Sequence, residues 1–323
     1  MEKLLSVVIP VYKVERYINK CLDSLILPDE IMDKLEVIIV NDGTPDNSAI
    51  MAKEYEKKYP QTFRVIDKEN GGHGSAWNRG LKEAKGKYLK FLDSDDWFET
   101  FEQFFRLLED LDVDLVYSHI NKCYESSNQV VLSSAQNVVF NKTFHIEDYN
   151  LDILPNGFWY WTYKTEMLQK CHPLFVEHVF YDDAILFYAP YIMGKTMCFL
   201  DLTLYNYRLD RPGQSVSIEV KKNHAKDYEK VSLSIIDFFD HHNMDLSEKN
   251  VNYIHDSISR YCTMCFNCFL LLNYNEFKKI MDRWLPIIGS KQYIKPCNRI
   301  KMYKVCPNYL GWLVVRTIAN MRD

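Results

Sequence analysis

Two glycine-rich motifs that commonly bind nucleotides are missing from this sequence. After the apolar run at residues 4–11 the chain continues Tyr12-Lys13-Val14-Glu15, so the GxGxxG of a dinucleotide-binding Rossmann domain does not occur there. No GxxxxGK(S/T) occurs either, which excludes a P-loop. Apolar runs of about 18 residues, the length needed to span a bilayer, are also missing. Because the N-terminus leads directly into an apolar run, we expect no signal peptide.

The sequence also lacks the excess of positive charge typical of nucleic-acid-binding proteins. Its net charge is −5, so no nucleic-acid partner is expected. The nine cysteines, an odd number with irregular spacing, indicate reduced thiols in a cytosolic protein. Three of them, Cys262, Cys265 and Cys268, resemble part of an iron–sulfur ligand run. Because they share one face of an apolar helical segment, we expect them to pack as small hydrophobic side chains.

Apolar runs separated by helical periodicity make up the first part of the chain. Such runs occupy residues 4–11, 35–40, 63–66, 88–92 and 113–118, with further strands expected at 196–200 and 204–208. Strands alternating with helices, including those expected at 98–111 and 184–193, predict an α/β fold. Its central sheet is expected to be mostly parallel, with helices on both faces. From residue 221 apolar residues recur only at helical spacing, so we expect one domain at 1–220 and a helical C-terminal region at 221–323.

Acidic side chains follow three of the first four expected strands. Asp42 and Asp67 come at the ends of the second and third strands, and Asp93, Asp95 and Asp96 follow the fourth. In such sheets ligands bind beyond the carboxyl ends of the strands. Three neighbouring carboxylates repel one another, and a divalent cation such as Mn²⁺ or Mg²⁺ relieves that repulsion while binding phosphate oxygens. The pattern predicts a metal–phosphate site, although Asp96 also suits the N-cap of the next helix.

Five segments, taken in order, resemble the motifs of a known family. They are SVVIPVYKVERYINKCLDSL, IIVNDGTPDNS, KENGGHGSAWNRGLKEAKGKYLKFLDSDDW, YDDAILFYAPYIMGK and LYNYRLDRPGQSVS. Across residues 4–217 the chain resembles a family 2 glycosyltransferase of the GT-A fold, an inverting, nucleotide-sugar-dependent enzyme of the kind that builds bacterial surface polysaccharides. The resemblance makes residues 1–220 the catalytic domain. It implies a metal-dependent hexosyltransferase with a UDP-sugar donor and a glycan or lipid-linked acceptor.

The resemblance also implies roles for residues at matching positions. Asp183 would be the general base, with Asp182 as its rival, and Asp95 and Asp93 would bind the metal. Residues expected at the donor nucleotide are Val11, Tyr12, Asp42, Asp67, His73, Arg79 and Asp93. Those expected near the diphosphate or sugar are Ser94, Arg208 and Gln214, and those near the acceptor are Trp159 and Trp161. Where the family often has Ala-Arg-Asn this chain has Ala76-Trp77-Asn78, so Arg79 or His73 would take the place of the arginine.

These assignments have plainer structural alternatives. Asp183 suits a helix cap, Asp42 an Asx turn, and Trp159 and Trp161 core packing. Two other functions also fit the fold: a sugar nucleotidyltransferase and a non-catalytic sugar- or nucleotide-binding module. A nucleotidyltransferase usually has a basic, glycine-rich loop after the first strand, and this chain does not. The complete set of acidic residues argues against a non-catalytic module.

The C-terminal tail, residues 291–322, mixes basic side chains with aromatic and aliphatic ones. This composition suits an interfacial membrane contact, and it equally suits a helix that closes the C-terminal core. We expect a cytoplasmic protein. If the tail is an interfacial contact, we expect the protein to bind peripherally to the inner face of the plasma membrane. A lipid-linked acceptor would make such contact useful.

Overall fold

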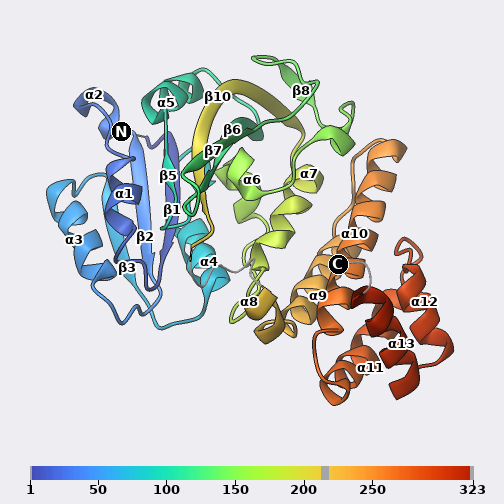
Figure 1. Ribbon diagram of the computed structural model, residues 1–323. Coiled ribbons are helices and arrows are strands. Elements are labelled where there is room, and N and C mark those ends of the chain that lie inside the picture. The colour runs from blue at the N-terminus through green and yellow to red at the C-terminus, as the bar shows by residue number, and fades with distance from the viewer. Residues whose placement is uncertain (1, 212–217, 321–323) are drawn as a thin grey trace. The chain divides into compact units, whose positions relative to one another are not determined.

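The computed structural model describes residues 2–211 and 218–320. The chain divides into two compact units, Met1–Pro212 and Gly213–Asp323. This division falls a few residues before the boundary expected at residue 220. The sheet belongs to the first unit, and the second unit is helical throughout its described part (Figure 1).

In the described part of the first unit, ten strands form one sheet with the main path β3-β2-β1-β4-β9-β6-β10-β5. β7 pairs with β6 and β8 pairs with β10 beside this path. The strands are β1 Leu5–Val11, β2 Leu35–Asn41, β3 Phe63–Asp67, β4 Tyr88–Phe91, β5 Trp97–Phe98, β6 Leu115–Tyr124, β7 Gln129–Ser133, β8 Thr143–His145, β9 Trp161–Lys164 and β10 Thr196–Leu209.

The sheet is mixed. Strands β1 to β4 are parallel, as the alternation of strands and helices predicts. β9 runs antiparallel to both of its neighbours, β4 and β6, and β10 runs parallel to β6. Every residue of β1 and of β4 is buried, because helices cover both faces of the parallel part. The expected α/β class is confirmed.

Seven α-helices and three short 3₁₀ turns surround the sheet in the described part of the first unit. Figure 1 shows α1 and α3 on one face of the β1–β3 region and α4 on the other. The bounds are α1 Ile18–Asp23, α2 Asp29–Met32, α3 Ser48–Lys58, α4 His73–Glu83, α5 Phe101–Glu109, α6 Thr165–Gln169 and α7 Ala189–Met193, with the 3₁₀ turns η1 Leu151–Ile153, η2 Phe158–Tyr160 and η3 Asp182–Phe187. Helix α4 packs closely on β1 at Gly80. A Cβ at this position would lie 2.1 Å from a methyl group of Val8, so only glycine fits.

The parallel strands bring their carboxyl ends to one edge of the sheet. Val11 pairs with Asn41, and Asn41 pairs with Asp67. β4 is shorter, since Phe91 pairs with Val8 in the middle of β1. The acidic segment that follows β4 therefore starts beside the last residues of β1 and lies at the same edge as Asp67.

Three elements differ from the sequence-based expectation. The strands expected at 196–200 and 204–208 form the single strand β10, with register shifts between Phe199 and Thr203 and between Thr203 and Tyr205. The helix expected at 98–111 starts at Phe101, after the short strand β5. The helix expected at 184–193 is instead the 3₁₀ turn η3 followed by α7.

The second unit has its own core around Trp284 and Phe266, which are fully buried. Its helices are α8 Ile218–Asn223, α9 Asp227–His241, α10 Glu248–Phe269, α11 Tyr274–Ser290, α12 Asn298–Val305 and α13 Tyr309–Asn320. The side chains of Ser247 and Asn273 cap α10 and α11 by accepting hydrogen bonds from backbone N–H groups. Cys262, Cys265 and Cys268 are all buried on α10, as expected for packing side chains. Among residues 2–211 and 218–320, no helix combines the length and the apolar character needed to cross a bilayer.

Candidate active site

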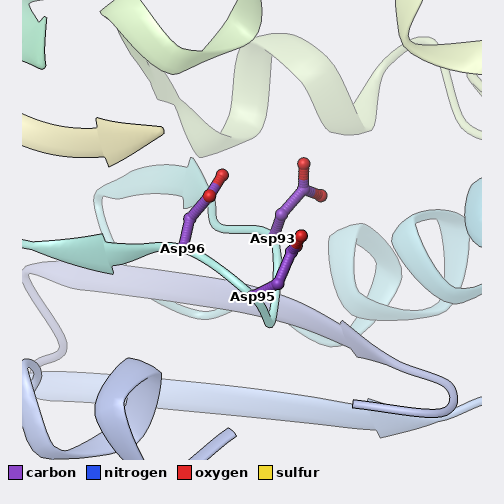
Figure 2. A group of neighbouring side chains, drawn as sticks. All are labelled: Asp93, Asp95 and Asp96. Carbon is purple, nitrogen blue, oxygen red and sulfur yellow. The ribbon is translucent and has the colours of Figure 1, made fainter. Parts of the chain in front are cut away.

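The loop after β4 carries three carboxylates that project to the same side (Figure 2). One oxygen from each of Asp93, Asp95 and Asp96 lies within 4.8 Å of the others. Within the described ranges this is the one cluster of side chains with the makeup of a metal site. Carboxylate oxygens are the ligands that hard divalent cations prefer.

Asp96 is held inside the protein. Its side chain is 1% exposed. One carboxylate oxygen accepts a hydrogen bond of 2.7 Å from the Tyr205 hydroxyl, and the other accepts one of 2.7 Å from the backbone N–H of Arg208. The alternative of Asp96 as a helix cap is wrong, because α5 starts later and Thr100 takes the N-cap position. Asp96 instead ties the acidic loop to β10.

Asp95 pairs with an arginine that the sequence did not identify as a site residue. The Arg211 guanidinium donates to the Asp95 carboxylate, and Arg208 Nε donates to the Asp95 backbone carbonyl at 2.9 Å. Burial and the neighbouring Asp93 raise the pKa of Asp95, while Arg211 acts to lower it. Arg211 belongs to the same LYNYRLDRPGQSVS motif as Arg208.

The three carboxylates fit a divalent cation of the Mn²⁺ or Mg²⁺ type. The donors are all hard oxygens. Burial, followed by repulsion from the neighbouring carboxylates, raises the pKa of Asp96 as well as that of Asp95. Both oxygens of Asp96 already accept hydrogen bonds from the protein. Asp93 and Asp95 are therefore the better placed ligands, and Asp95 would exchange Arg211 for the cation.

His73 connects the acidic loop to a second acidic pair. Its Nε2 lies 3.2 Å from Oδ1 of Asp93, and its Nδ1 lies 3.1 Å from Oδ2 of Asp182. Burial acts to lower the pKa of His73, but the carboxylates of Asp182 and Asp93 outweigh burial and raise that pKa well above its usual value. His73 opens α4 directly after Gly72, whose positive φ of 84° turns the chain into the helix.

Asp183 lies next to Asp182 in the turn η3 and has a raised pKa. Burial, followed by repulsion from Asp182, raises the pKa of Asp183 to about 7. Asp182 is 2% exposed and engaged with His73. Because Asp182 is already paired with His73 and Asp183 has the raised pKa, Asp183 is the better candidate for the carboxylate that accepts a proton.

Trp77 takes the place of the arginine that the family often has. It is fully buried and stacks on Phe91 with 4.4 Å between ring centroids. Its ring also lies 4.1 Å from that of His73. Trp77 therefore packs against the His73 ring from the protein core. A charged side chain would be costly to bury at this position.

Four of the residues expected at the nucleotide, Val11, Tyr12, Asp42 and Asp67, lie at the ends of β1, β2 and β3. Asp42 accepts hydrogen bonds from Lys68 Nζ at 2.7 Å and from the N–H groups of Gly71 and Gly72 at 2.9 Å each. It thereby holds the loop that precedes α4. Asp67 accepts from Asn41 and Lys53 and keeps 53% of its side chain exposed.

Val11 and Tyr12 stand at the end of β1. Val11 is buried and accepts a hydrogen bond from the Asp42 N–H, whereas Tyr12 is 43% exposed. Arg79 lies farther along α4 and pairs with Glu83 instead of reaching the acidic cluster. Ser94 is 5% exposed within the acidic loop.

Arg208 comes from the LYNYRLDRPGQSVS motif, and its guanidinium lies over the rings of Tyr17 and Trp97. Gln214 falls outside the described residues. Four side chains of this region were not singled out from the sequence: Arg211, Tyr205, Tyr207 and Lys90.

Trp159 and Trp161 have different surroundings. Trp161 is 3% exposed and packs in the core against Tyr117 and Phe199. Trp159 stacks on Tyr207 with 4.7 Å between centroids and 27° between ring planes. Burial and the charges of Asp93, Asp96, Asp95 and Asp183 raise the pKa of Tyr207, so the electrostatic influence of both acidic groups extends to this stacked pair.

Lys90 supports the segment that carries Trp159. It is fully buried, and its Nζ donates to the carbonyl oxygens of Trp159 at 2.8 Å and of Trp161 at 3.0 Å. Burial lowers the pKa of Lys90 well below its usual value. A buried amine that bonds only carbonyls in the described part of the chain fixes backbone position rather than neutralising an acid.

Comparisons with known proteins agree with this geometry. The family model for glycosyl transferase family 2 matches residues 6–171. An uncharacterized glycosyltransferase of Bacillus subtilis, EpsJ, is 31% identical over 254 residues, covering 76% of this chain and 72% of EpsJ.

Among solved structures, the Staphylococcus aureus protein TarS (residues 1–349, with UDP-GlcNAc) superposes with a TM-score of 0.68 at 20% identity, covering 99% of this chain and 92% of TarS. The mannosyltransferase PcManGT of Pyrobaculum calidifontis, bound to GDP-Man and Mn²⁺, superposes with a TM-score of 0.53 at 15% identity, covering 99% and 88%. These two likenesses agree with the expected GT-A fold. With the family match over half of its length and the similarity to EpsJ, the chain belongs to glycosyl transferase family 2.

Proposed function

We propose that this protein is an inverting glycosyltransferase that moves a sugar from a UDP-sugar to a hydroxyl group of a glycan or lipid-linked acceptor. The observation that carries the proposal is the pairing of two acidic groups through one histidine. The Asp93–Asp96 loop offers oxygen ligands for a metal, and His73 connects it to the Asp182–Asp183 turn, where Asp183 has a pKa of about 7.

Asp183 is the proposed general base. An acceptor hydroxyl has a pKa far above neutral, so it needs a carboxylate within hydrogen-bond reach to take its proton as it attacks. A carboxylate that is deprotonated near neutral pH but has a raised pKa suits this transfer better than an ordinary aspartate. One base suffices for a single displacement with inversion, because no covalent intermediate forms.

The acidic loop is the proposed leaving-group site. A cation held by Asp93 and Asp95 would stabilise the charge that develops on the departing diphosphate. Arg208 and Arg211 lie at the same loop and add positive charge there. We assign Arg208, Ser94 and Gln214 to the diphosphate and sugar side, and Asp67 with the backbone of Val11 and Tyr12 to the nucleotide.

The choice of UDP rests on the fold relative. TarS has been crystallised with UDP-GlcNAc and with UDP, whereas PcManGT, with the lower TM-score, was solved with GDP-Man. We propose that Asp42 acts through the Lys68–Gly72 loop that it organises, and that the exposed Asp67 faces the base.

The stacked pair of Trp159 and Tyr207 is the proposed acceptor platform. Aromatic faces pack well against the apolar faces of sugar rings, and the charges of Asp183 and of the acidic loop act on Tyr207 of this pair. An acceptor ring on this platform would present its hydroxyl to the base. We place the reaction on the cytoplasmic side of the membrane, in the synthesis of a surface polysaccharide.

A donor panel tests the function. Purified protein would be incubated with UDP- and GDP-sugars in the presence and absence of Mn²⁺, and released nucleotide and the anomeric configuration of the product would be measured. We expect Mn²⁺-dependent release of UDP and an inverted anomeric centre. A retained configuration, or preference for GDP-sugars, would contradict the corresponding part of the proposal.

A further inference from the structure

The helices α12 and α13 of the second unit expose a cluster of large hydrophobic side chains. Val305 is 87% exposed, Leu310 is 65% exposed and Tyr309 is 52% exposed. Three further members are between 41% and 49% exposed, namely Met302, Leu313 and Val314. Single exposed apolar residues are ordinary on protein surfaces, but six within thirteen residues of sequence are not.

These side chains are not needed for the core of the unit. The inner faces of the same helices are filled by Ile300, Tyr303, Trp312 and Val315, each at most 6% exposed. On α13 the exposed residues recur at 309, 310, 313 and 314, which is one stripe of a helix. Helix α13 is thus apolar on both sides, whereas a helix that only closes a core has a polar outer face.

Helices α12 and α13 present this stripe together. Gly311 is close to the carbonyl of Cys306, and Asn308 accepts hydrogen bonds from the N–H groups of Leu310 and Gly311 in the short connection. The two helices also pack against each other. The exposed residues at the end of α12 and on α13 therefore belong to one surface.

The charged side chains that α12 and α13 themselves carry are all basic. Although the whole chain has a net charge of −5, residues 291–322 contain no Asp or Glu. Lys291 and Lys295 pair with acidic residues of other helices. Arg299, Lys301 and Lys304 form no ion pair within the described ranges, so their charge is available to a partner.

We propose that this surface docks the protein onto an anionic lipid bilayer. We define the docking face as Met302, Val305, Tyr309, Leu310, Leu313 and Val314 with the basic residues Arg299, Lys301 and Lys304. Apolar side chains flanked by unpaired basic ones bind where acyl chains meet negatively charged headgroups. A second copy of the chain fits less well, because a symmetric contact would place the same basic residues opposite one another. The inference stands independently of the proposed transfer reaction.

Vesicle co-sedimentation of the full chain tests the proposal. We expect binding to phosphatidylcholine vesicles that contain phosphatidylglycerol, and little binding to vesicles of phosphatidylcholine alone. The triple variant Arg299→Gln/Lys301→Gln/Lys304→Gln should bind the anionic vesicles about a hundredfold more weakly. The double variant Val305→Ser/Leu310→Ser should bind the anionic vesicles at least about tenfold more weakly.

Matched controls come from the first unit. Lys57→Gln/Lys58→Gln/Lys82→Gln changes the net charge equally at exposed positions, and Ile50→Ser removes an apolar side chain that is 62% exposed. Both should bind vesicles as the unaltered protein does, and thermal unfolding would verify that every variant is folded. Equal binding by the docking-face variants and their controls would overturn the proposal. So would a dimer in light scattering that the docking-face substitutions dissociate without any change in vesicle binding.

Discussion

The Nδ1 atom of His73 lies 3.1 Å from a carboxylate oxygen of Asp182, a residue 109 positions away in sequence and 2% exposed. The other ring nitrogen reaches Asp93. One imidazole therefore fixes the position of the turn that holds the proposed base relative to the loop that holds the proposed metal ligands.

Replacing His73 with alanine should destabilise the protein. The change leaves the buried carboxylate of Asp182 without its partner, which we expect to lower the free energy of unfolding by about 2 kcal/mol. Chemical denaturation would measure it. Arg79→Ala on the same helix breaks an exposed pair with Glu83 and should cost at most about 0.5 kcal/mol. Equal losses for the two variants would show that the bridge contributes nothing specific.

Transfer should depend on the ionisation of Asp183. Because its pKa is about 7, the rate should rise with pH up to about neutral and then level off. Asp183→Asn should reduce the turnover number by about 10²–10⁴-fold while donor binding, measured by calorimetry, stays within a few-fold. Asp182→Asn serves as the comparison: if it alone abolishes transfer and Asp183→Asn does not, the base assignment is reversed.

The same residue should make stability fall as pH rises. The folded-state pKa of Asp183 is raised above that of the unfolded chain, so the folded state binds more protons between about pH 4 and about pH 7. The free energy of unfolding therefore falls by at most about 4 kcal/mol as the pH rises through this window. Asp183→Asn should therefore unfold at a higher temperature than the unaltered protein at about pH 8 and at a similar temperature at about pH 4. Parallel pH profiles for the two proteins would contradict this expectation.

Substitutions at Asp95 and Arg211 should change Mn²⁺ affinity in opposite directions. Asp95→Asn removes a ligand and should weaken Mn²⁺ binding at least about tenfold. Arg211→Gln removes the cation that competes for Asp95 and should strengthen Mn²⁺ binding in the absence of nucleotide by up to about tenfold. Calorimetric titration would measure both. Asp67→Asn, an exposed carboxylate outside the cluster, is the control and should leave Mn²⁺ affinity unchanged.

The acceptor platform can be tested apart from the donor site. Trp159→Ala should raise the acceptor KM about tenfold and leave hydrolysis of the donor by water unchanged, whereas Trp159→Phe should retain most of the stacking. Lys90→Met fills the same buried space but loses the two bonds to carbonyl oxygens. We expect it to fold with a stability within about 1 kcal/mol of the unaltered protein and to share the KM defect. An unchanged acceptor KM in both Trp159→Ala and Lys90→Met would remove the platform from the proposal.

The elements predicted best from sequence are those whose residues are uniformly buried. β1 and β4 appear as apolar runs because helices cover both of their faces. The sequence predicts two strands where β10 is one, with Asp201 and Thr203 between them, yet pairing with β6 continues through the register shifts. β9 was not expected within the main path, since its antiparallel position depends on tertiary pairing with β4 and β6.

The acidic residues of the site could be identified from sequence, but their partners could not. Arg211 and Asp95 are 116 residues apart, and nothing in the sequence distinguishes Arg211 from Arg208 as the partner of that carboxylate. The bridge through His73 likewise joins three segments whose proximity exists only after folding. Trp77 is a related case: only the structure shows that it packs beneath His73.

The hydrogen bonds of Asp42 bear on how donor preference could be engineered. The Asp42 carboxylate accepts hydrogen bonds from Lys68, Gly71 and Gly72. Substitutions of Asp42 would therefore deform the loop before α4 and reduce activity toward every donor alike. Asp67 stands one strand away with half of its side chain in solvent. Among the residues that the structure describes, only the side chains of Asn41 and Lys53 would lose a bond to it. A mutant library that aims to alter the nucleotide base accepted should therefore vary Asp67 and leave Asp42 intact.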